Sequence, residues 1–282
     1  MVYSIGNQEL KVEIDSLGAE LISVCAHGKE MLWQNPTGDW AGHAPVIFPV
    51  CGNCTVIIDG TTYPYSFHGF AYKRVFTVVE QSETAIKMQL RSDEQTLSMY
   101  PYAFELTYTY TVNGNALEIT HEVRNLSNKE MYFSMGGHES FNLDEDLDSY
   151  ELHFEKDEQF VHCPHNATGM LTGENQILGS GKILPIPKSI LQNSETLILT
   201  GIRSNSVSLV KTTGEKVADV CFDGFHNLLL WRPMDAKMIC IEPWKTLPDT
   251  VGKQCVELSQ KQGIEKIANQ AIFTTTRKIF YY

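Results

Sequence analysis

The sequence has few positive charges and no long apolar run, and both shortages narrow its possible partners. Its 282 residues carry 22 Lys and Arg against 34 Asp and Glu, a formal net charge of −12. This acidic balance disfavours nucleic acid and anionic membrane surfaces. No stretch approaches the roughly 20 apolar residues that a membrane-spanning helix needs. A small neutral substrate is compatible with this charge.

Targeting and cofactor signatures are also missing. The N-terminus, MVYSIGNQEL, lacks a basic segment followed by an apolar core, so we expect no signal peptide. The seven cysteines are an odd number, which together with the missing signal favours reduced thiols in a cytoplasmic protein. The sequence has neither a glycine-rich phosphate loop nor a GxSxG elbow. These absences argue against a nucleotide cofactor and against that type of serine nucleophile.

Alternation of apolar and polar residues with a period of two dominates the chain and predicts β-strands. Residues 105 to 124 are the clearest case and predict a hairpin whose turn, Asn113-Gly114, supplies positive φ angles. Asp59-Gly60 predicts a second hairpin. The apolar runs at 227–231 and 238–241 are typical of fully buried strands.

Helical patterns are few. They are limited to residues 94–99 and, interrupted by Gly263, residues 256–268. No linker, repeat or break in composition divides the chain. We therefore expect one domain over residues 1–282, an all-β fold built as a large antiparallel β-sandwich.

Two kinds of segment imitate metal sites but lack the required context. CGNC at 51–54 has CxxC spacing, and HCPH at 162–165 could supply a second ligand pair for zinc. The strand-like TVII follows CGNC, whereas a thioredoxin-type motif needs the start of a helix. The acidic segment 144–155 has Ser149 where a calcium loop requires glycine. We expect no metal site and interpret 144–155 as a solvated loop.

Glycines lie beside two of the nine histidines. His68 precedes a glycine in YSFHGFAY, and His138 follows a glycine pair in FSMGGHESFNL. Glycine at such positions lets the backbone bend or a ligand approach closely. His121 instead shares an apolar strand face and is predicted to lie in the core, whereas His153 is predicted to be exposed.

Glu242 is the single carboxylate between the apolar run 238–241 and the pair Pro243-Trp244. Two interpretations are open from the residues alone. The strand could simply reach water at this point. The carboxylate could also be a general base at the mouth of a pocket.

Four segments then occur in one order: HAPVIFPVCGN at 43–53, HGFA at 68–71, GGHESFN at 136–142 and IEPW at 241–244. With them the chain, from about residue 3 to its end, resembles the aldose 1-epimerase (galactose mutarotase) family, and in particular its compact bacterial branch. The resemblance implies a large antiparallel β-sandwich. It also implies interconversion of the α and β anomers of a free aldose, with no cofactor and no metal.

The resemblance assigns roles to individual residues. His138 matches the family's general acid, Glu242 its general base, and His68 a histidine that binds or orients the sugar. Opening a hemiacetal requires one group to take the proton of the anomeric hydroxyl and another to protonate the ring oxygen. A carboxylate and an imidazolium can supply both functions, and Trp244 is expected to form a wall of the site.

The sequence also departs from the family pattern. Asn53 and Tyr72 stand where many members carry arginine, and we expect both residues to contact the sugar. Asn53 can hydrogen-bond a hydroxyl without the charge or the bidentate fork of arginine. The segment 208–217 offers no equivalent of the aspartate that better-studied mutarotases carry. These departures leave the identity of the sugar open.

Two further functions are compatible with the sequence. The chain could be a non-catalytic carbohydrate-binding protein of the same fold, or an epimerase of a phosphorylated hexose that uses Lys73 and Arg74. A glycosidase needs two carboxylates across the bond. Glu139, next to His138, is predicted to point to the other face of its strand. The expected partner is a small-molecule sugar, and the protein is expected to be a monomer or homodimer.

Overall fold

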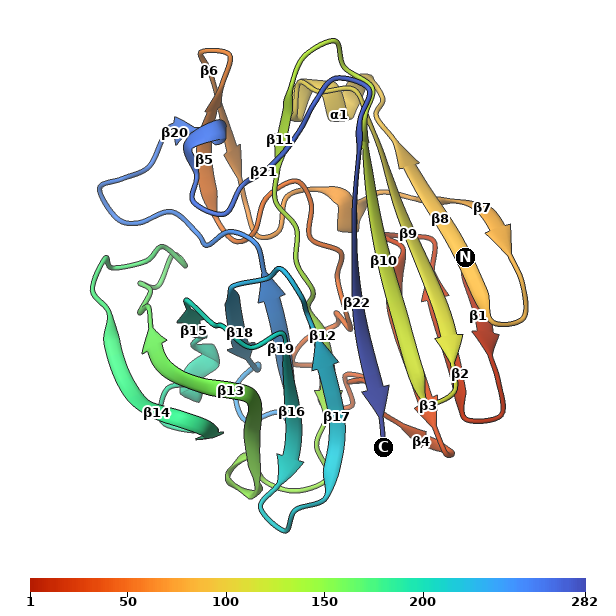
Figure 1. Ribbon diagram of the computed structural model, residues 1–282, viewed down its shortest axis with the longest axis vertical. Helices are drawn as coiled ribbons and strands as arrows, with labels where there is room; N and C mark the ends of the chain where they lie inside the picture. Colours follow the sequence, from red (N-terminus) through yellow and green to blue (C-terminus); the bar gives the residue numbers. More distant parts are fainter.

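The computed structural model describes residues 1–282, apart from the side chain of Asn193. Over this range the chain forms 22 strands, one α-helix and four short 3-10 helices. The prediction of an all-β fold with large antiparallel sheets is therefore confirmed (Figure 1). In the described structure, no helix is long and apolar enough to cross a membrane.

One large sheet runs through the whole molecule. Neighbouring strands in it are antiparallel, and β14 extends it by pairing with β13. In spatial order its other strands are β12 (Glu139–Asn142), β19 (Met238–Trp244), β18 (Asn227–Trp231), β15 (Leu197–Thr200), β13 (Tyr150–His162), β16 (Ser206–Lys211), β17 (Lys216–Cys221), β22 (Ile272–Tyr281), β10 (Ala116–Asn125), β9 (Phe104–Asn113), β8 (Ala85–Arg91) and β7 (Thr77–Gln81), and β14 spans Gln176–Pro185.

Three smaller sheets complete the fold. The first contains β1 (Val2–Gly6), β2 (Leu10–Asp15), β3 (Glu20–Ala26) and β4 (Lys29–Glu30). The second contains β20 (Val256–Glu257), β5 (Cys54–Ile58) and β6 (Thr61–Tyr65), and the third β11 (Met131–Phe133) and β21 (Glu265–Ile267). The helices are α1 (Glu94–Met99), η1 (Ala71–Lys73), η2 (Leu147–Ser149), η3 (Gln192–Ser194) and η4 (Leu258–Gln260).

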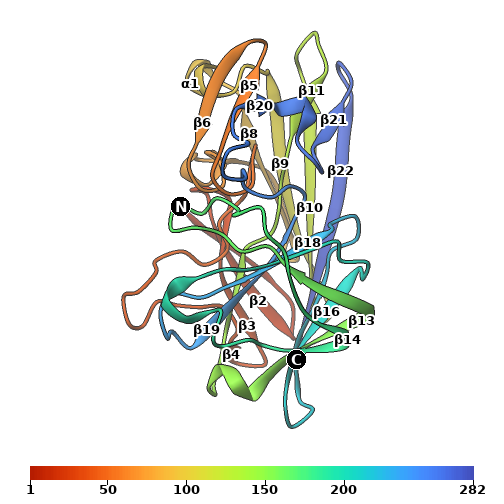
Figure 2. The same cartoon turned by 90° about the vertical axis from the view of Figure 1, so that its left-hand side faces the viewer.

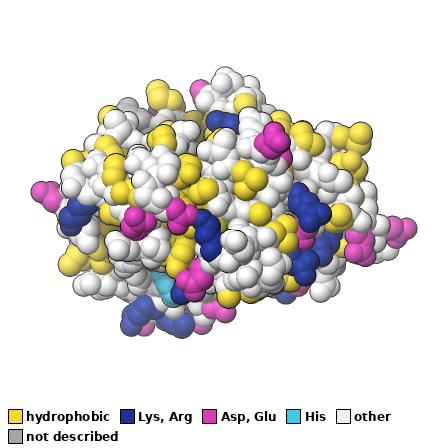
Figure 3. Space-filling view, turned by 90° about the horizontal axis from the view of Figure 1, so that it is seen from above, with side chains coloured by type: hydrophobic (Ala, Val, Ile, Leu, Met, Phe, Trp, Pro, Cys, Tyr) yellow, Lys and Arg dark blue, Asp and Glu magenta, His cyan; other side chains and the backbone are white. Residues whose placement is uncertain are grey.

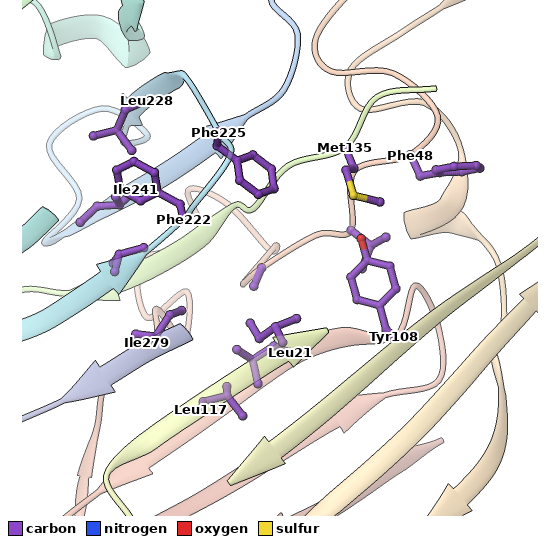
Figure 4. Packing of buried hydrophobic residues seen from close by; sticks show 14 of the residues in the cluster. Leu21, Phe48, Tyr108, Leu117, Met135, Phe222, Phe225, Leu228, Ile241 and Ile279 are labelled. Atoms are coloured by element: carbon purple, nitrogen blue, oxygen red, sulfur yellow. The ribbon is translucent and has the colours of Figure 1, made fainter. Parts of the chain in front are cut away.

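The β1–β4 sheet covers the half of the large sheet that contains β8, β9 and β10 (Figures 1 and 2). Tyr110 of β9 crosses between the two layers and donates its hydroxyl to the carbonyl of Ala19, at 2.7 Å. Figure 4 shows the core that joins this half to the rest, with Leu21 of β3 and Tyr108 of β9 on one side and Leu228 and Ile241 on the other.

The predicted local elements compare with the structure as follows. Helix α1 and the Asp59-Gly60 hairpin are confirmed, and Asp59 and Gly60 both have positive φ, 51° and 75°. The hairpin over 105 to 124 also forms, but its turn lies one residue later than predicted. Asn113 pairs with Ala116, so the turn residues are 114 and 115, and of these only Gly114 has a positive φ, 58°.

The predicted helix over residues 256–268 is wrong. The segment forms β20, η4 and β21. β20 pairs with β5 and β21 pairs with β11, so the two strands belong to different sheets. Gly263 lies at φ +80° and packs so closely on the carbonyl oxygen of Lys245 that no Cβ would fit there. The left-handed glycine separates η4 from β21 and prevents a continuous helix.

Charges of both signs are mixed on the face seen from above. Lys and Arg side chains lie there in small groups with Asp or Glu beside them (Figure 3). The mixture leaves this face without a broad basic surface.

Candidate active site

The site lies at the β12 end of the large sheet, and strand register alone brings its two central residues together. β12 pairs with β19 so that Glu139 faces Ile241, and the bridge between Gly136 and Trp244 continues the same register. His138 is therefore opposite Glu242. Residues directly opposite each other on antiparallel strands have Cβ atoms about 4.5–5.5 Å apart on one face of the sheet. His138 Nε2 lies 3.3 Å from Glu242 Oε2.

The alternation of side chains across these strands divides the site from the core. On the face of His138 and Glu242, the next strands add Leu229 of β18 and Ile198 of β15, which are register partners of each other. Apolar residues next to these four in the chain point to the other face and belong to the main core, as Ile241 does beside Glu242. The apolar residues of β18 and β19 thus serve two separate layers, which explains why both strands are apolar along most of their length.

Two glycines let the chain segments approach closely beside His138. A Cβ on Gly136 would lie 2.6 Å from Trp244 Cδ1 and 2.9 Å from the carbonyl oxygen of Pro243. A Cβ on Gly137 would collide with the guanidinium of Arg277. No larger side chain can occupy either position without moving these neighbours. These glycines thus admit neighbouring chain segments, whereas the close approach of a ligand stays a prediction.

A cavity of about 760 Å³ opens above the pair. Its lining includes the three carboxylates of Glu20, Glu195 and Glu242, and among the described residues it includes no Lys or Arg. The side chains that line it are those of Glu20, Trp40, Pro45, Asn53, Phe67, His68, Tyr72, His138, His165, Asn166, Ala167, Ser194, Glu195, Thr196, Ile198, Leu229, Trp231, Glu242, Trp244 and Pro248. Glycines 42, 52 and 169 contribute backbone.

Aromatic rings surround His138. Trp40 stacks on it with ring centroids 5.4 Å apart and an interplanar angle of 24°, and His68 meets it edge-on at 5.0 Å. Trp244 lies edge-on to His68 at 5.3 Å, and Trp231 lies edge-on to Trp40 at 5.2 Å. Three of the four tryptophans therefore line one cavity. This enclosure holds the imidazole in place and keeps bulk water away from it.

His138 and Glu242 are almost completely buried, and this burial shifts the pKa of both groups. His138 is 7% exposed and Glu242 is 2% exposed. Burial lowers the pKa of His138 to about 4. Burial, with a smaller contribution from the Glu139 carboxylate, raises the pKa of Glu242 well above the usual value for a carboxyl group. Between these two limits the pair holds a single proton, which the 3.3 Å contact allows the two groups to share.

His68 is held in an unusual backbone conformation at the cavity wall. Its φ is +68°, in the left-handed region, and the following Gly69, at φ +74°, packs directly on the carbonyl of Phe48. Burial lowers the pKa of His68 well below 6.5, so the ring is neutral near pH 7. Its Nδ1 atom is buried and has no hydrogen-bond partner among the described residues. Such an atom is available to a ligand hydroxyl.

The structure brings all six predicted site residues to one cavity: Asn53, His68, Tyr72, His138, Glu242 and Trp244. Asn53 also has a structural bond, because its Nδ2 donates to the carbonyl of Thr168 at 2.7 Å. Its side-chain oxygen has no partner among the described residues, so it can still accept a hydrogen bond from a ligand.

Sequence analysis missed Trp40, Trp231 and Glu20. Glu20 accepts the backbone N–H groups of His43 and Ala44, at 2.7 and 3.1 Å, and so anchors the start of the 43–53 segment. Trp231 ends the strand predicted at 227–231, and period-two counting from Leu229 could have placed it on the site face. Trp40 and Glu20 had no local signal.

The segments considered for metals have other structural roles. Cys51 contacts the hydroxyl of Ser134 at 3.1 Å, and burial raises the pKa of Cys54 to about 12, so that thiol stays protonated. Asp144, in the acidic loop, contacts Lys29 and Lys211. Among the described residues, the group whose ligand atoms converge within 4.8 Å is His138, Cys240 and Glu242, at the site itself.

Three side-chain placements can also be compared with their predictions. His121 is fully buried, as predicted, and accepts from Arg277 Nε at 3.3 Å. His153 is only half-exposed and contacts Glu151 at 2.9 Å. Glu139 points away from the cavity, as predicted, and binds Arg277.

The fold and the cavity together define a galactose mutarotase-like β-sandwich. The galactose mutarotase-related enzyme of Lactobacillus acidophilus has the same fold, with a TM-score of 0.91 and 27% identity, over 100% of this chain and 97% of that one. A galactose mutarotase-like protein of Lactobacillus casei aligns over all of both chains, with a TM-score of 0.92 and 25% identity.

Sequence comparison then shows the family. The family model described as aldose 1-epimerase matches residues 1–222, and the chain belongs to this family. The LacX proteins of Lactococcus lactis, plasmid and chromosomal, are each 30% identical to it over 285 residues, which cover 95% of both sequences. The predicted family resemblance is thereby confirmed.

Proposed function

We propose that the protein is an aldose 1-epimerase that interconverts the α and β anomers of a free aldose. The observation that carries this proposal is the contact between His138 and Glu242 on the floor of an aromatic-walled cavity. Membership of the aldose 1-epimerase family gives the reaction class. The acid–base pair supplies the two groups that the reaction needs.

Ring opening moves one proton onto the enzyme and one off it. When the shared proton lies on His138, Glu242 is the carboxylate and takes the proton of the O1 hydroxyl, while the His138 imidazolium gives its Nε2 proton to O5. The C1–O5 bond breaks, its electron pair stays on O5, and C1=O1 forms. O1 and O5 are both bonded to C1, so they can contact the two neighbouring groups together. Each proton transfer contributes roughly 10²–10⁴-fold to the rate.

The open-chain sugar then turns about its C1–C2 bond and closes on the other face of the aldehyde. O5 attacks C1 and returns its proton to His138, while O1 takes a proton from Glu242. The enzyme ends in its starting protonation state. The burial of the pair protects the single shared proton from exchange with bulk water during this cycle.

The remaining cavity residues are assigned to binding. Tryptophan rings offer flat apolar surfaces to the C–H faces of a sugar, and the free atoms His68 Nδ1 and Asn53 Oδ1 can bond to hydroxyls. The lining offers no support for a phosphorylated substrate, because none of its described residues is Lys or Arg. Arg74 contacts Gln95 and Asp93, and Lys73 lies 4.9 Å above the ring of Tyr72.

Polarimetry tests the proposal. Freshly dissolved α-glucose and α-galactose should reach anomeric equilibrium faster with the protein than without it, and their 6-phosphates should not. The matched control is Glu242→Gln, which keeps the shape of the side chain but cannot accept a proton at neutral pH. If the wild type binds these sugars without accelerating equilibration, the protein is the non-catalytic binding protein instead.

A further inference from the structure

The cavity is much larger than a single hexose ring requires. A cavity of about 150 Å³ holds benzene, with its six non-hydrogen atoms. On that scale a hexose of about 12 non-hydrogen atoms needs about 300 Å³, and a disaccharide of about 23 needs about 570 Å³. The observed volume is about 760 Å³. One ring would leave more than half of this space to water, whereas two rings would fill most of it.

The position of the acid–base pair determines which part of a longer sugar would lie inside. His138 and Glu242 are almost completely buried, so they form the closed end of the cavity. The anomeric centre with a free hydroxyl must reach this end. The reducing ring of a disaccharide therefore has to enter first, and its second ring would lie towards the rim.

An exposed aromatic ring stands in that direction. Phe67 lines the cavity and is also 55% exposed, so its ring lies where the cavity meets solvent. The ring centroid of Phe67 lies 6.0 Å from that of His68, and the centroid of His68 lies 5.0 Å from that of His138. Two successive ring contacts thus lead from the buried pair to the rim.

Phe67 packs against a neighbouring loop. A Cβ on Gly169 would lie 3.4 Å from Phe67 and 3.2 Å from Asn53 Nδ2, so both side chains pack on the same glycine. Asn166 holds the loop closed by accepting from the backbone N–H groups of Thr168 and Met170, at 2.9 and 3.1 Å. Phe67 therefore presents an apolar surface close to Asn53, whose amide oxygen is free.

We propose that Phe67 and Asn53 form an outer sugar subsite, and that the preferred substrate is a neutral reducing disaccharide. This inference rests on the proposed epimerase function. The inner ring would place its anomeric carbon at His138 and Glu242, and the outer ring would stack its C–H face on Phe67. A stacked ring with a few placed hydrogen bonds is the usual composition of a small-molecule site. No bond of the outer ring changes in the reaction.

Kinetics with matched sugars test the outer subsite. Lactose and maltose serve as disaccharide probes, and galactose and glucose as single-ring probes. We expect wild-type kcat/KM to be about tenfold higher for a disaccharide, mainly through a lower KM. Phe67→Ala should reduce the ratio of disaccharide to hexose kcat/KM at least fivefold, and Phe67→Trp should preserve it. Val79→Ala, which changes an apolar residue on β7 that is 51% exposed, is the control for surface substitutions.

The outer subsite would be overturned if the ratio of disaccharide to hexose kcat/KM in Phe67→Ala stayed within twofold of the wild-type ratio. The same conclusion follows if hexoses are converted but disaccharides are not. Binding separates this failure from a failure of the epimerase proposal. Calorimetry on Glu242→Gln, with and without Phe67→Ala, measures disaccharide affinity in the absence of turnover. Tighter binding of the disaccharide that depends on Phe67 would support the subsite even if no sugar were epimerised.

Discussion

His138 and Glu139 are neighbours in the chain but point to opposite faces of the sheet. His138 enters the cavity, and Glu139 enters the core, where its two carboxylate oxygens accept from Arg277 Nη1 and Nη2 at 2.6 and 2.7 Å. Both partners of this ion pair are about 97% removed from solvent. The pair of His138 and Glu242 therefore lies across the sheet from a buried salt bridge, with Gly137 packed against the guanidinium.

This arrangement predicts a large cost for breaking the buried salt bridge. Removing one partner of such a pair leaves an uncompensated charge and destabilises a protein by about 3–5 kcal/mol. Glu139→Gln and Arg277→Met should each lower the free energy of unfolding by such an amount in urea titrations. The double variant Glu139→Gln/Arg277→Met should lose less than the sum of the two single variants. Strict additivity would show that the pair is not coupled.

Glu242 should make the folded protein less stable at neutral pH. Its pKa is raised well above 4.5 in the folded state, so the folded chain keeps a proton that the unfolded chain releases. Stability contributed by this group therefore falls as the pH rises above about 4.5. Glu242→Gln removes this penalty. Its Tm should exceed that of the wild type at pH 7, by about 2–4 °C for each kcal/mol relieved.

The pH dependence supplies the control for that prediction. Near pH 4 the carboxyl group is protonated in both states, so the gain in Tm should disappear there. Calorimetric scans of the wild type and Glu242→Gln at pH 4 and pH 7 measure this gain in Tm. Equal gains at pH 4 and pH 7 would indicate a packing effect instead of an ionisation effect. The same variant should lose about 10²–10⁴-fold in anomerisation rate.

Features of the fold and the site that depend on neighbouring residues could be predicted from the sequence. Features that depend on contacts between distant segments could not. The hairpin over 105 to 124 follows from local periodicity, and the strands at 227–231 and 238–241 follow from apolar runs. The family motifs pointed to His138 and Glu242 as site residues. The direct pairing of β12 with β19, which places these two residues opposite each other, joins distant segments and has no local signal. The contribution of Trp40 to the wall has none either. The erroneous helix at 256–268 shows a local pattern overruled by Gly263 and by strand pairing.

His68 should contribute mainly to sugar binding. Its buried Nδ1 has no partner among the described residues, and its ring contacts both His138 and Trp244. We expect His68→Asn to raise KM about tenfold with a smaller change in kcat. A tenfold rise corresponds to the loss of about one hydrogen bond to the sugar. Asparagine is the suitable replacement because it tolerates the left-handed backbone at φ +68°, where alanine is strained. A change confined to kcat would instead assign His68 to the chemical step.

Cys255 should be the reactive thiol of the folded protein. All seven cysteines are free, but Cys255 alone is exposed, whereas Cys51, Cys54, Cys163 and Cys240 are buried. Because the thiolate must reach the reagent, a disulfide reagent such as DTNB should titrate Cys255 quickly, the half-buried Cys25 and Cys221 more slowly, and the four buried thiols only on unfolding. Cys255→Ser should remove the fast phase. An equally rapid reaction of another thiol in that variant would show that exposure does not select Cys255.

The last prediction concerns the dependence of kcat/KM on pH. Epimerisation needs the pair of His138 and Glu242 to hold one proton, because one group must accept and the other must donate. Below about pH 4 the imidazole is also protonated, and the pair has no base left. Above the raised pKa of Glu242 the last proton is lost, and the pair has no acid left. A bell-shaped profile should result, with limbs that belong to the pair and not to either residue alone.

His138→Asn distinguishes this shared proton from two independent groups. Only Glu242 then titrates, so the residual activity, reduced about 10²–10⁴-fold, should rise through the raised pKa of Glu242 and show no fall at higher pH. The acid limb near pH 4 should disappear, because the coupled pair that produces it no longer exists. A descending limb that survives in this variant would place the acid elsewhere, and His68, 5.0 Å away between ring centroids, is the group to substitute next.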